Sequence, residues 1–208
     1  MYTIDQLHSL TKKPKINDIS LSLLQDYYEA FLSPFIYVYT IDDGVNTKQI
    51  EVDFKPDYLC HLLAIEKIYK KTVAQRDLVN YRGILGWDNI RNSTIDFSTL
   101  IAANKREFKN SKDKYVYFYT LPLLFDKPSA VLFGNKQYIN TNVDCEMLFY
   151  DVYDNAYVNI GLSESSTTNR FFPRTLLIER ITAQNNGKKF IDGNTQITVA
   201  KKPNIILV

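Results

Sequence analysis

Residues 35–54 read FIYVYTIDDGVNTKQIEVDF. All of the first seven residues are β-branched or aromatic, which is the composition of a buried strand. Residues 49–54 alternate between polar and apolar side chains, and Asp42-Asp43-Gly44 supplies a turn between the two runs. This stretch therefore predicts a β-hairpin.

Helical patterns stand on both sides of this hairpin. Asn17 or Asp18 can cap a helix that ends before Ser33-Pro34, because a residue that precedes proline is pushed out of the helical region. After the hairpin, Pro56 opens a leucine-rich helix that ends in Lys67, Lys70 and Lys71. Further helices are predicted around residues 87–90 and over 95–109. Residues 115–125 are apolar on nearly every side and could form a helix or a strand, of which we favour the helix.

From residue 129 onward, short apolar segments alternate with turn residues. These segments cover residues 129–133, 146–153, 157–162, 174–180 and 195–200. We therefore expect an α+β fold with an N-terminal helix and hairpin, a helical middle, and an antiparallel β-sheet in the C-terminal half. We expect one domain over residues 1–208, in which residues 1–33 form a helical extension of a main domain over 34–208.

Composition excludes several classes of protein. The 208 residues are 45% hydrophobic and 23% charged, as in an ordinary globular chain. Cys60 and Cys145 lack a Cys-x-x-Cys spacing, which argues against a disulfide scaffold or a structural zinc site and fits a reducing cytosol. No apolar run reaches 18 residues and no secretory signal is visible, so we expect no membrane partner.

Charge is unevenly distributed along the chain. The net charge is only +2, but residues 61–125 carry 11 Lys and Arg against 6 Asp and Glu. A basic middle is compatible with a surface that faces a polyanion, although a solvated helical face would look the same.

Two segments carry candidate functional groups, and the glycine-rich nucleotide loops and common hydrolase motifs are absent. The first segment places His61 on the leucine-rich helix, where it is either a functional imidazole or a hydrogen-bonded core histidine. Lys67 lies about 600° further around that helix, so the two side chains point to different sides. The second segment places Arg170, Arg174 and Thr175 at the start of a strand. Arginines there can hold phosphate or form surface ion pairs with Glu179 or with Asp residues.

Both segments belong to a wider resemblance. Residues 36–67 show a strand, an Asp-Gly turn, a strand ending in an aromatic residue, and then His-Leu-Leu-small-Ile-x-Lys. With features at residues 86–90, 95–100, 143–151, 158–162 and 172–179, this order resembles the fourth group of phage Barnase–EndoU–Colicin–RelE-like nucleases. The resemblance covers roughly residues 34–180. The family has Gly where Ala64 stands and often His where Glu66 stands, changes that we expect to leave the helix intact.

The resemblance implies a metal-independent endoribonuclease of a phage or mobile element, without a cofactor or metal. Such an enzyme helps the ribose 2′-hydroxyl attack the adjacent phosphorus, which requires a base, an acid and positive charge. His61 would be the acid or base, since it is the only side chain in the matched region that ordinarily titrates near neutral pH. Arg174 would act on the phosphate in catalysis and Thr175 would orient it, while Lys67 and Arg170 would bind the substrate. The nuclease-like domain would be residues 34–208.

The expected partner is RNA in the cytoplasm of a bacterial host, in a toxin or host-takeover role. A protein antitoxin or a host protein is a further possible partner, and the sequence leaves the oligomeric state open. The alternative from another functional class is a catalytically inactive binding protein or inhibitor, such as an antidefence factor. A structural virion or assembly protein is a third alternative.

Overall fold

The computed structural model describes residues 1–133 and 143–207. The chain forms two compact units, each built from two segments. The first unit is Met1–Ser33 with Lys55–Tyr119, and the second is Pro34–Phe54 with Thr120–Val208. The single domain with a helical extension stays a prediction.

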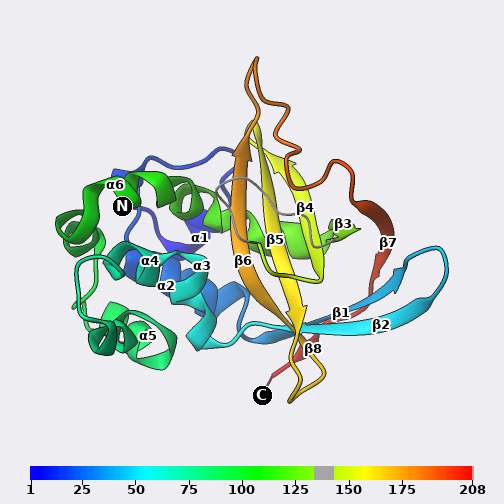
Figure 1. The fold of residues 1–208 in the computed structure, drawn as a ribbon, viewed down its shortest axis with the longest axis horizontal. Coiled ribbons are helices and arrows are strands. Elements are labelled where there is room, and N and C mark those ends of the chain that lie inside the picture. Colours follow the sequence, from blue (N-terminus) through cyan, green and yellow to red (C-terminus); the bar gives the residue numbers. More distant parts are fainter. Residues whose placement is uncertain (134–142, 208) are drawn as a thin grey trace. The chain divides into compact units, whose positions relative to one another are not determined.

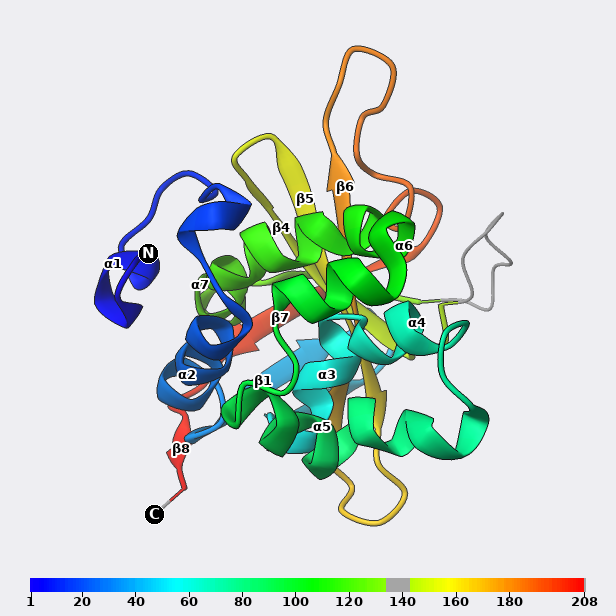
Figure 2. The same ribbon diagram turned by 90° about the vertical axis from the view of Figure 1, so that its left-hand side faces the viewer.

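Within the described residues, the first unit consists of helices and their connections. Its elements are α1 (Ile4–His8), η1 (Ile16–Asp18), α2 (Leu21–Phe31), η2 (Pro56–Tyr58), α3 (Leu59–Leu62), α4 (Ile65–Tyr69), η3 (Gln75–Tyr81), α5 (Gly83–Arg91) and α6 (Phe97–Tyr117), where η marks a 3-10 helix. Figure 2 shows α6, α4, α3 and α5 lying next to one another.

Helix α2 is anchored to distant parts of the first unit by buried polar side chains. The Gln25 amide donates to the carbonyl of Trp87 at 2.8 Å, and the Tyr27 hydroxyl donates to the carbonyl of Tyr119 at 2.7 Å. Ser20 caps this helix by accepting from the N–H of Leu23, so the predicted cap at Asn17 or Asp18 is wrong. Both of those residues lie in η1 instead.

The leucine-rich helix after the hairpin is broken, not continuous. Ala64 adopts a left-handed conformation with φ 56° and ψ 29°, which separates α3 from α4. The N–H of Ala64 bonds back to the carbonyl of His61 at 3.0 Å, as at the end of a helix. The expectation that alanine at this position leaves the helix intact is therefore wrong. The predicted rotation of about 600° from His61 to Lys67 is wrong as well, because the two residues lie in different helices.

As far as the structure describes it, the second unit contains a β-sheet and the α-helix α7. Its elements are β1 (Phe35–Asp42), β2 (Thr47–Asp53), α7 (Leu121–Asp126), β3 (Ser129–Leu132), β4 (Met147–Tyr153), β5 (Ala156–Glu164), β6 (Phe171–Arg180), β7 (Thr195–Lys201) and β8 (Ile205–Ile206). The 3-10 helix η4 (Phe118–Thr120) joins α6 to α7 across the boundary between the units. Figure 1 shows β4, β5 and β6 side by side.

The sheet closes on itself. Its order is β2-β6-β5-β4-β3-β7-β1-β8, and β1 also pairs with β2, so seven strands form a closed barrel. Strand β8 is an additional strand on the edge of β1. The barrel is mixed, because β2 and β6 run parallel where Val52 pairs with Phe171.

This topology shows that the predicted fold, with an open antiparallel sheet confined to the C-terminal half after a helical middle, is wrong. The hairpin of β1 and β2 itself is confirmed, with Tyr39 opposite Ile50. The prediction failed because it gave the hairpin no further neighbours, whereas β7 takes the second edge of β1 and β6 takes the second edge of β2. A strand pattern reports burial on each face but does not identify the pairing partners.

Aromatic side chains form a core of the second unit around α7. The Phe125 ring lies 5.0 Å from that of Tyr37, 4.8 Å from that of Phe54 and 5.8 Å from that of Phe149, between centroids. The Tyr39 hydroxyl donates to the carbonyl of Phe125, which ties α7 to β1. Burial raises the pKa of both Tyr37 and Tyr39, so these side chains remain neutral.

None of the described helices is long and apolar enough to cross a membrane.

We predict that Ala64→Gly leaves the free energy of unfolding unchanged or raises it by up to about 1 kcal/mol, because glycine has no Cβ to strain the left-handed conformation. The matched change Ala102→Gly, at an exposed position of α6, is expected to lower it by about 1 kcal/mol. Urea unfolding of the wild type and of both variants measures these changes in the free energy of unfolding. A larger loss at Ala64 than at Ala102 would contradict this account.

Candidate functional site: a basic surface on two helices

Exposed cations gather on α6 and beside it. A kink at Asn104 divides this helix, and the Asn104 side chain caps the second part by accepting from the N–H of Glu107 at 3.1 Å. The second part exposes four cations within eight residues, at helical spacing, and α4 adds Lys67. We define the α4–α6 basic surface as Lys67, Lys105, Arg106, Lys109 and Lys112.

The four exposed cations of α6 have no anion paired with them among the residues that the structure describes. Among residues 1–133 and 143–207, none of Lys105, Arg106, Lys109 and Lys112 forms an ion pair, and all four side chains are exposed. Lys105, Arg106 and Lys109 line a shallow groove of about 350 Å³ together with Asn110. These positive charges are therefore available to an external anion.

A second set of charges connects α4 with α6. The Lys67 ammonium lies 3.5 Å from a Glu107 carboxylate oxygen, and its side chain is 65% exposed while that of Glu107 is 17% exposed. Burial, and to a lesser degree the positive charge of Lys67, lowers the pKa of Lys114 to about 8. Lys114 is thus a half-buried cation that loses its proton more readily than an ordinary lysine.

His61 lies in the same unit and is accessible. It is an exposed residue of α3, while its neighbours Cys60 and Leu62 are buried. The interpretation of His61 as a core histidine is therefore wrong. The other histidine, His8, is held by a stack of its ring on Phe31 at 4.0 Å and a hydrogen bond between Nδ1 and the hydroxyl of Tyr27.

The predicted arginines of the second unit are occupied by internal contacts. Arg170 pairs with Glu51 at 2.8 Å and Arg174 pairs with Asp144 at 3.0 Å. Both arginines therefore form ion pairs, which was one of the two alternatives for them, but neither pairs with Glu179.

Thr175 has a packing contact beside a glycine. It lies next to Gly161 of β5, where any Cβ would come within 2.8 Å of the Thr175 methyl group. The close approach of these two residues explains why a residue without a side chain stands at position 161.

The five predicted site residues divide between the two units. His61 and Lys67 belong to the first, whereas Arg170, Arg174 and Thr175 belong to the second. Neither unit by itself holds all five, and their roles in one site stay predictions. Among the residues that the structure places, no group of three or more His, Cys, Asp or Glu side chains could hold a metal ion.

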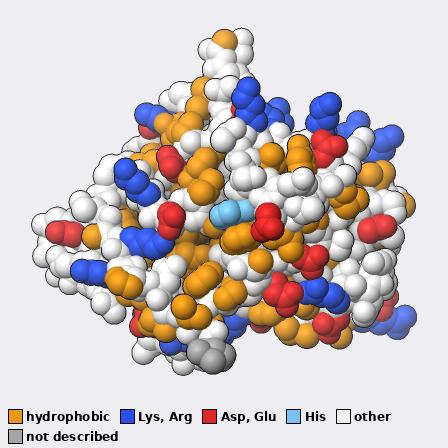
Figure 3. Space-filling model, turned by 180° about the vertical axis from the view of Figure 1, so that it is seen from behind, with side chains coloured by type: hydrophobic (Ala, Val, Ile, Leu, Met, Phe, Trp, Pro, Cys, Tyr) orange, Lys and Arg blue, Asp and Glu red, His pale blue; other side chains and the backbone are white. Residues whose placement is uncertain are grey.

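The four exposed cations of α6 are not among the residues predicted from the sequence. The excess of positive charge in residues 61–125 was visible there, but no site was assigned to it. The available signal was the spacing of Lys105, Lys109 and Lys112, which lie four and three residues apart and so share one face of a helix. On the face of the molecule in Figure 3, cations and anions are interspersed, which shows why net charge alone is a weak guide.

Comparison of the chain with protein-family models, with curated proteins and with solved structures gave no match.

We predict that Lys114→Met removes a contribution to stability that rises with pH. Between about pH 8 and pH 9.5 the unfolded chain keeps the Lys114 proton while the folded chain releases it, so Lys114 should add to the free energy of unfolding as the pH rises. Burial raises the pKa of the Cys60 and Cys145 thiols to about 12, so these thiols contribute a fall over the same range, in the wild type and in the variant alike. At pH 7 the variant should be more stable by about 1–2 kcal/mol, a value reduced for partial solvent access.

Urea unfolding of the wild type and the variant from pH 7 to 9.5 measures this effect as the difference between their free energies of unfolding, in which the contributions of the two thiols cancel. The matched control is Lys109→Met, which changes an exposed lysine of the same helix and should keep the wild-type pH profile. An unchanged pH profile in Lys114→Met would show that Lys114 is solvated like a surface lysine.

Proposed function

We propose that this protein binds RNA through the α4–α6 basic surface. The observation that carries the proposal is the set of four exposed cations on α6 that have no ion-pair partner in the described part of the chain. RNA is favoured over other polyanions by the resemblance to phage nucleases in residues 34–180. That resemblance also supports the cytoplasm of a bacterial host as the setting, with a toxin or host-takeover role.

The spacing of these cations suits a phosphate backbone. Phosphates attract Lys and Arg without regard to base sequence, and each contact releases counterions from the nucleic acid. The groove beside Lys105, Arg106 and Lys109 gives one strand a place to lie against these charges. Lys67 can join them, because its pairing with Glu107 is long and leaves most of its side chain in solvent.

The arginines of the second unit are weaker candidates for first contact with RNA. Arg170 is part-buried and already bonded to Glu51, so a phosphate would have to displace a carboxylate. Arg174 is exposed, and its pair with Asp144 is of the kind that contributes about 0–1 kcal/mol. Arg174 could therefore exchange Asp144 for a phosphate at a small cost.

A second candidate function is endoribonuclease activity with His61 as the acid or base. Its support is the exposure of His61 in the unit that also carries the basic surface. In this reaction the ribose 2′ oxygen attacks phosphorus and the bond from phosphorus to the 5′ oxygen breaks. A base takes the 2′ proton and an acid protonates the 5′ oxygen, which leaves a cyclic phosphate and a 5′-hydroxyl.

We predict that a variant with Lys105, Arg106 and Lys109 all changed to Gln binds single-stranded RNA about 10-fold or more weakly. Its plot of log affinity against log salt should be flatter by about two, since each lost phosphate contact removes about 0.7. Fluorescence anisotropy with a labelled RNA over a salt series measures both quantities.

The control for this experiment changes Lys127, Lys188 and Lys202 to Gln. These are three exposed lysines of the second unit, so the control removes the same charge and should bind RNA normally. Equal loss of affinity in both variants would contradict the assignment of the surface.

If the protein cleaves RNA, we predict that His61→Ala abolishes the cyclic-phosphate product while leaving RNA affinity unchanged. His8→Gln is the matched control, because it removes the other imidazole and should retain cleavage. Incubation of both variants with an end-labelled RNA pool, followed by analysis of the product ends, measures the effect. Cleavage that persists in His61→Ala would exclude this residue, and binding without cleavage by the wild type would favour the binding-protein function.

A further inference from the structure

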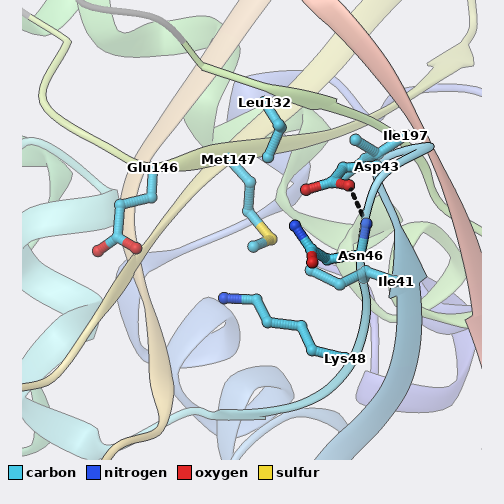
Figure 4. A pocket seen from close by; sticks show the side chains of 8 residues that line it. All are labelled: Ile41, Asp43, Asn46, Lys48, Leu132, Glu146, Met147 and Ile197. Atoms are coloured by element: carbon cyan, nitrogen blue, oxygen red, sulfur yellow. Dashed lines mark hydrogen bonds between the residues drawn. The ribbon is translucent and has the colours of Figure 1, made fainter.

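A pocket of about 320 Å³ lies in the second unit, between the tip of the β1–β2 hairpin and strands β3, β4 and β7. Figure 4 shows the eight side chains that line it. Half of them are apolar and half carry polar or charged groups. A small pocket with an apolar surface and a few polar groups is typical of a site for a small molecule.

The apolar part of this pocket is preformed. Ile41, Met147 and Ile197 are all buried, and they come from three strands that the barrel holds in register. Leu132 of β3 completes the apolar lining and lies opposite Met147 of β4. A hydrocarbon group could therefore bind here without first ordering the surface that it contacts.

The two carboxylates of the pocket are held in place by backbone N–H groups. One Asp43 oxygen accepts from Asn46 at 2.7 Å and from Val45 at 2.9 Å, and these bonds lower the pKa of Asp43. One Glu146 oxygen accepts from the N–H of Glu164 at 2.8 Å. Each carboxylate thus has one oxygen that is oriented by a backbone hydrogen bond.

Lys48 is the only cation among the lining residues, and it forms no salt bridge with a carboxylate of the described chain. Its ammonium lies 5.4 Å from the centre of the Phe171 ring. In Figure 4 the ammonium of Lys48 and the amide of Asn46 point toward Met147, while Glu146 lies on the opposite side of the pocket. Asp43 lies beside Asn46, so of the two carboxylates it is Glu146 that faces Lys48 and Asn46 across the pocket.

We propose that this pocket binds a free α-amino acid with a large aliphatic side chain. The ligand's carboxylate would meet Lys48 and Asn46, its ammonium would lie toward Glu146, and its side chain would cover the apolar lining. A simple anion would be repelled by the two carboxylates, and a simple cation would leave Lys48 unpaired. This site does not depend on the RNA surface, which belongs to the other unit.

Isothermal titration calorimetry of the full chain tests the proposal with four probes. L-leucine should bind, whereas 4-methylpentanoate lacks the ammonium, 3-methylbutylamine lacks the carboxylate, and L-serine lacks the aliphatic side chain. Each of these three should bind at least about 10-fold more weakly, since each loses one charged or apolar contact. Failure of L-leucine to bind, or equal binding of any of the other three, would overturn the proposal.

Two single variants assign the binding to this pocket. Lys48→Gln and Glu146→Gln alter exposed side chains, so both variants should fold, and each should weaken L-leucine binding about 10-fold or more. Lys202→Gln, at an exposed lysine outside the pocket, should bind as the wild type does. Undiminished binding in Lys48→Gln would overturn the assignment even if RNA binding by the other unit proved correct.

Discussion

Strand β1 forms hydrogen-bonded ladders on both of its edges, and the second unit depends on this arrangement. On one edge it pairs with β2 over most of its length, and on the other it pairs with β7 and β8. Its Tyr37 and Tyr39 side chains meet Phe125 of α7 and Phe149 of β4, so the same strand organises an aromatic core. Because β1 has neighbours on both edges, a chain segment near residue 40 is joined to one near residue 200.

The first unit depends on a different constraint, which is the backbone conformation at two residues that interrupt its helices. The left-handed Ala64 separates α3 from α4, and the kink at Asn104 divides α6. Helix α4 then packs against α6, and the pair formed by Lys67 and Glu107 connects them. The half-buried Lys114 near Lys67, together with the exposed cations of α6, gives this part of the unit its positive charge.

Local features of the fold could be predicted where short-range patterns were strong. The hairpin at residues 35–54 followed from strand composition, alternation and a turn, and nearly all of the helix predicted over residues 95–109 lies in α6. Residues 115–125, for which helix was favoured over strand, lie in the end of α6, in η4 and in α7, where Pro122 occupies the first turn. The break at Ala64 was missed because alanine usually favours a right-handed helix.

The sequence by itself determined most of the segments that form strands and helices, where the positive charge concentrates, and that His61 is one of only two imidazoles. These properties are local, since they follow from the spacing and type of neighbouring residues. Only the tertiary structure decided that the hairpin closes a barrel, that Arg170 and Arg174 are paired with Glu51 and Asp144, and that the described cations of α6 have no such partner. These are contacts between residues far apart in the chain, and a residue's own pattern carries no record of which distant group it will meet.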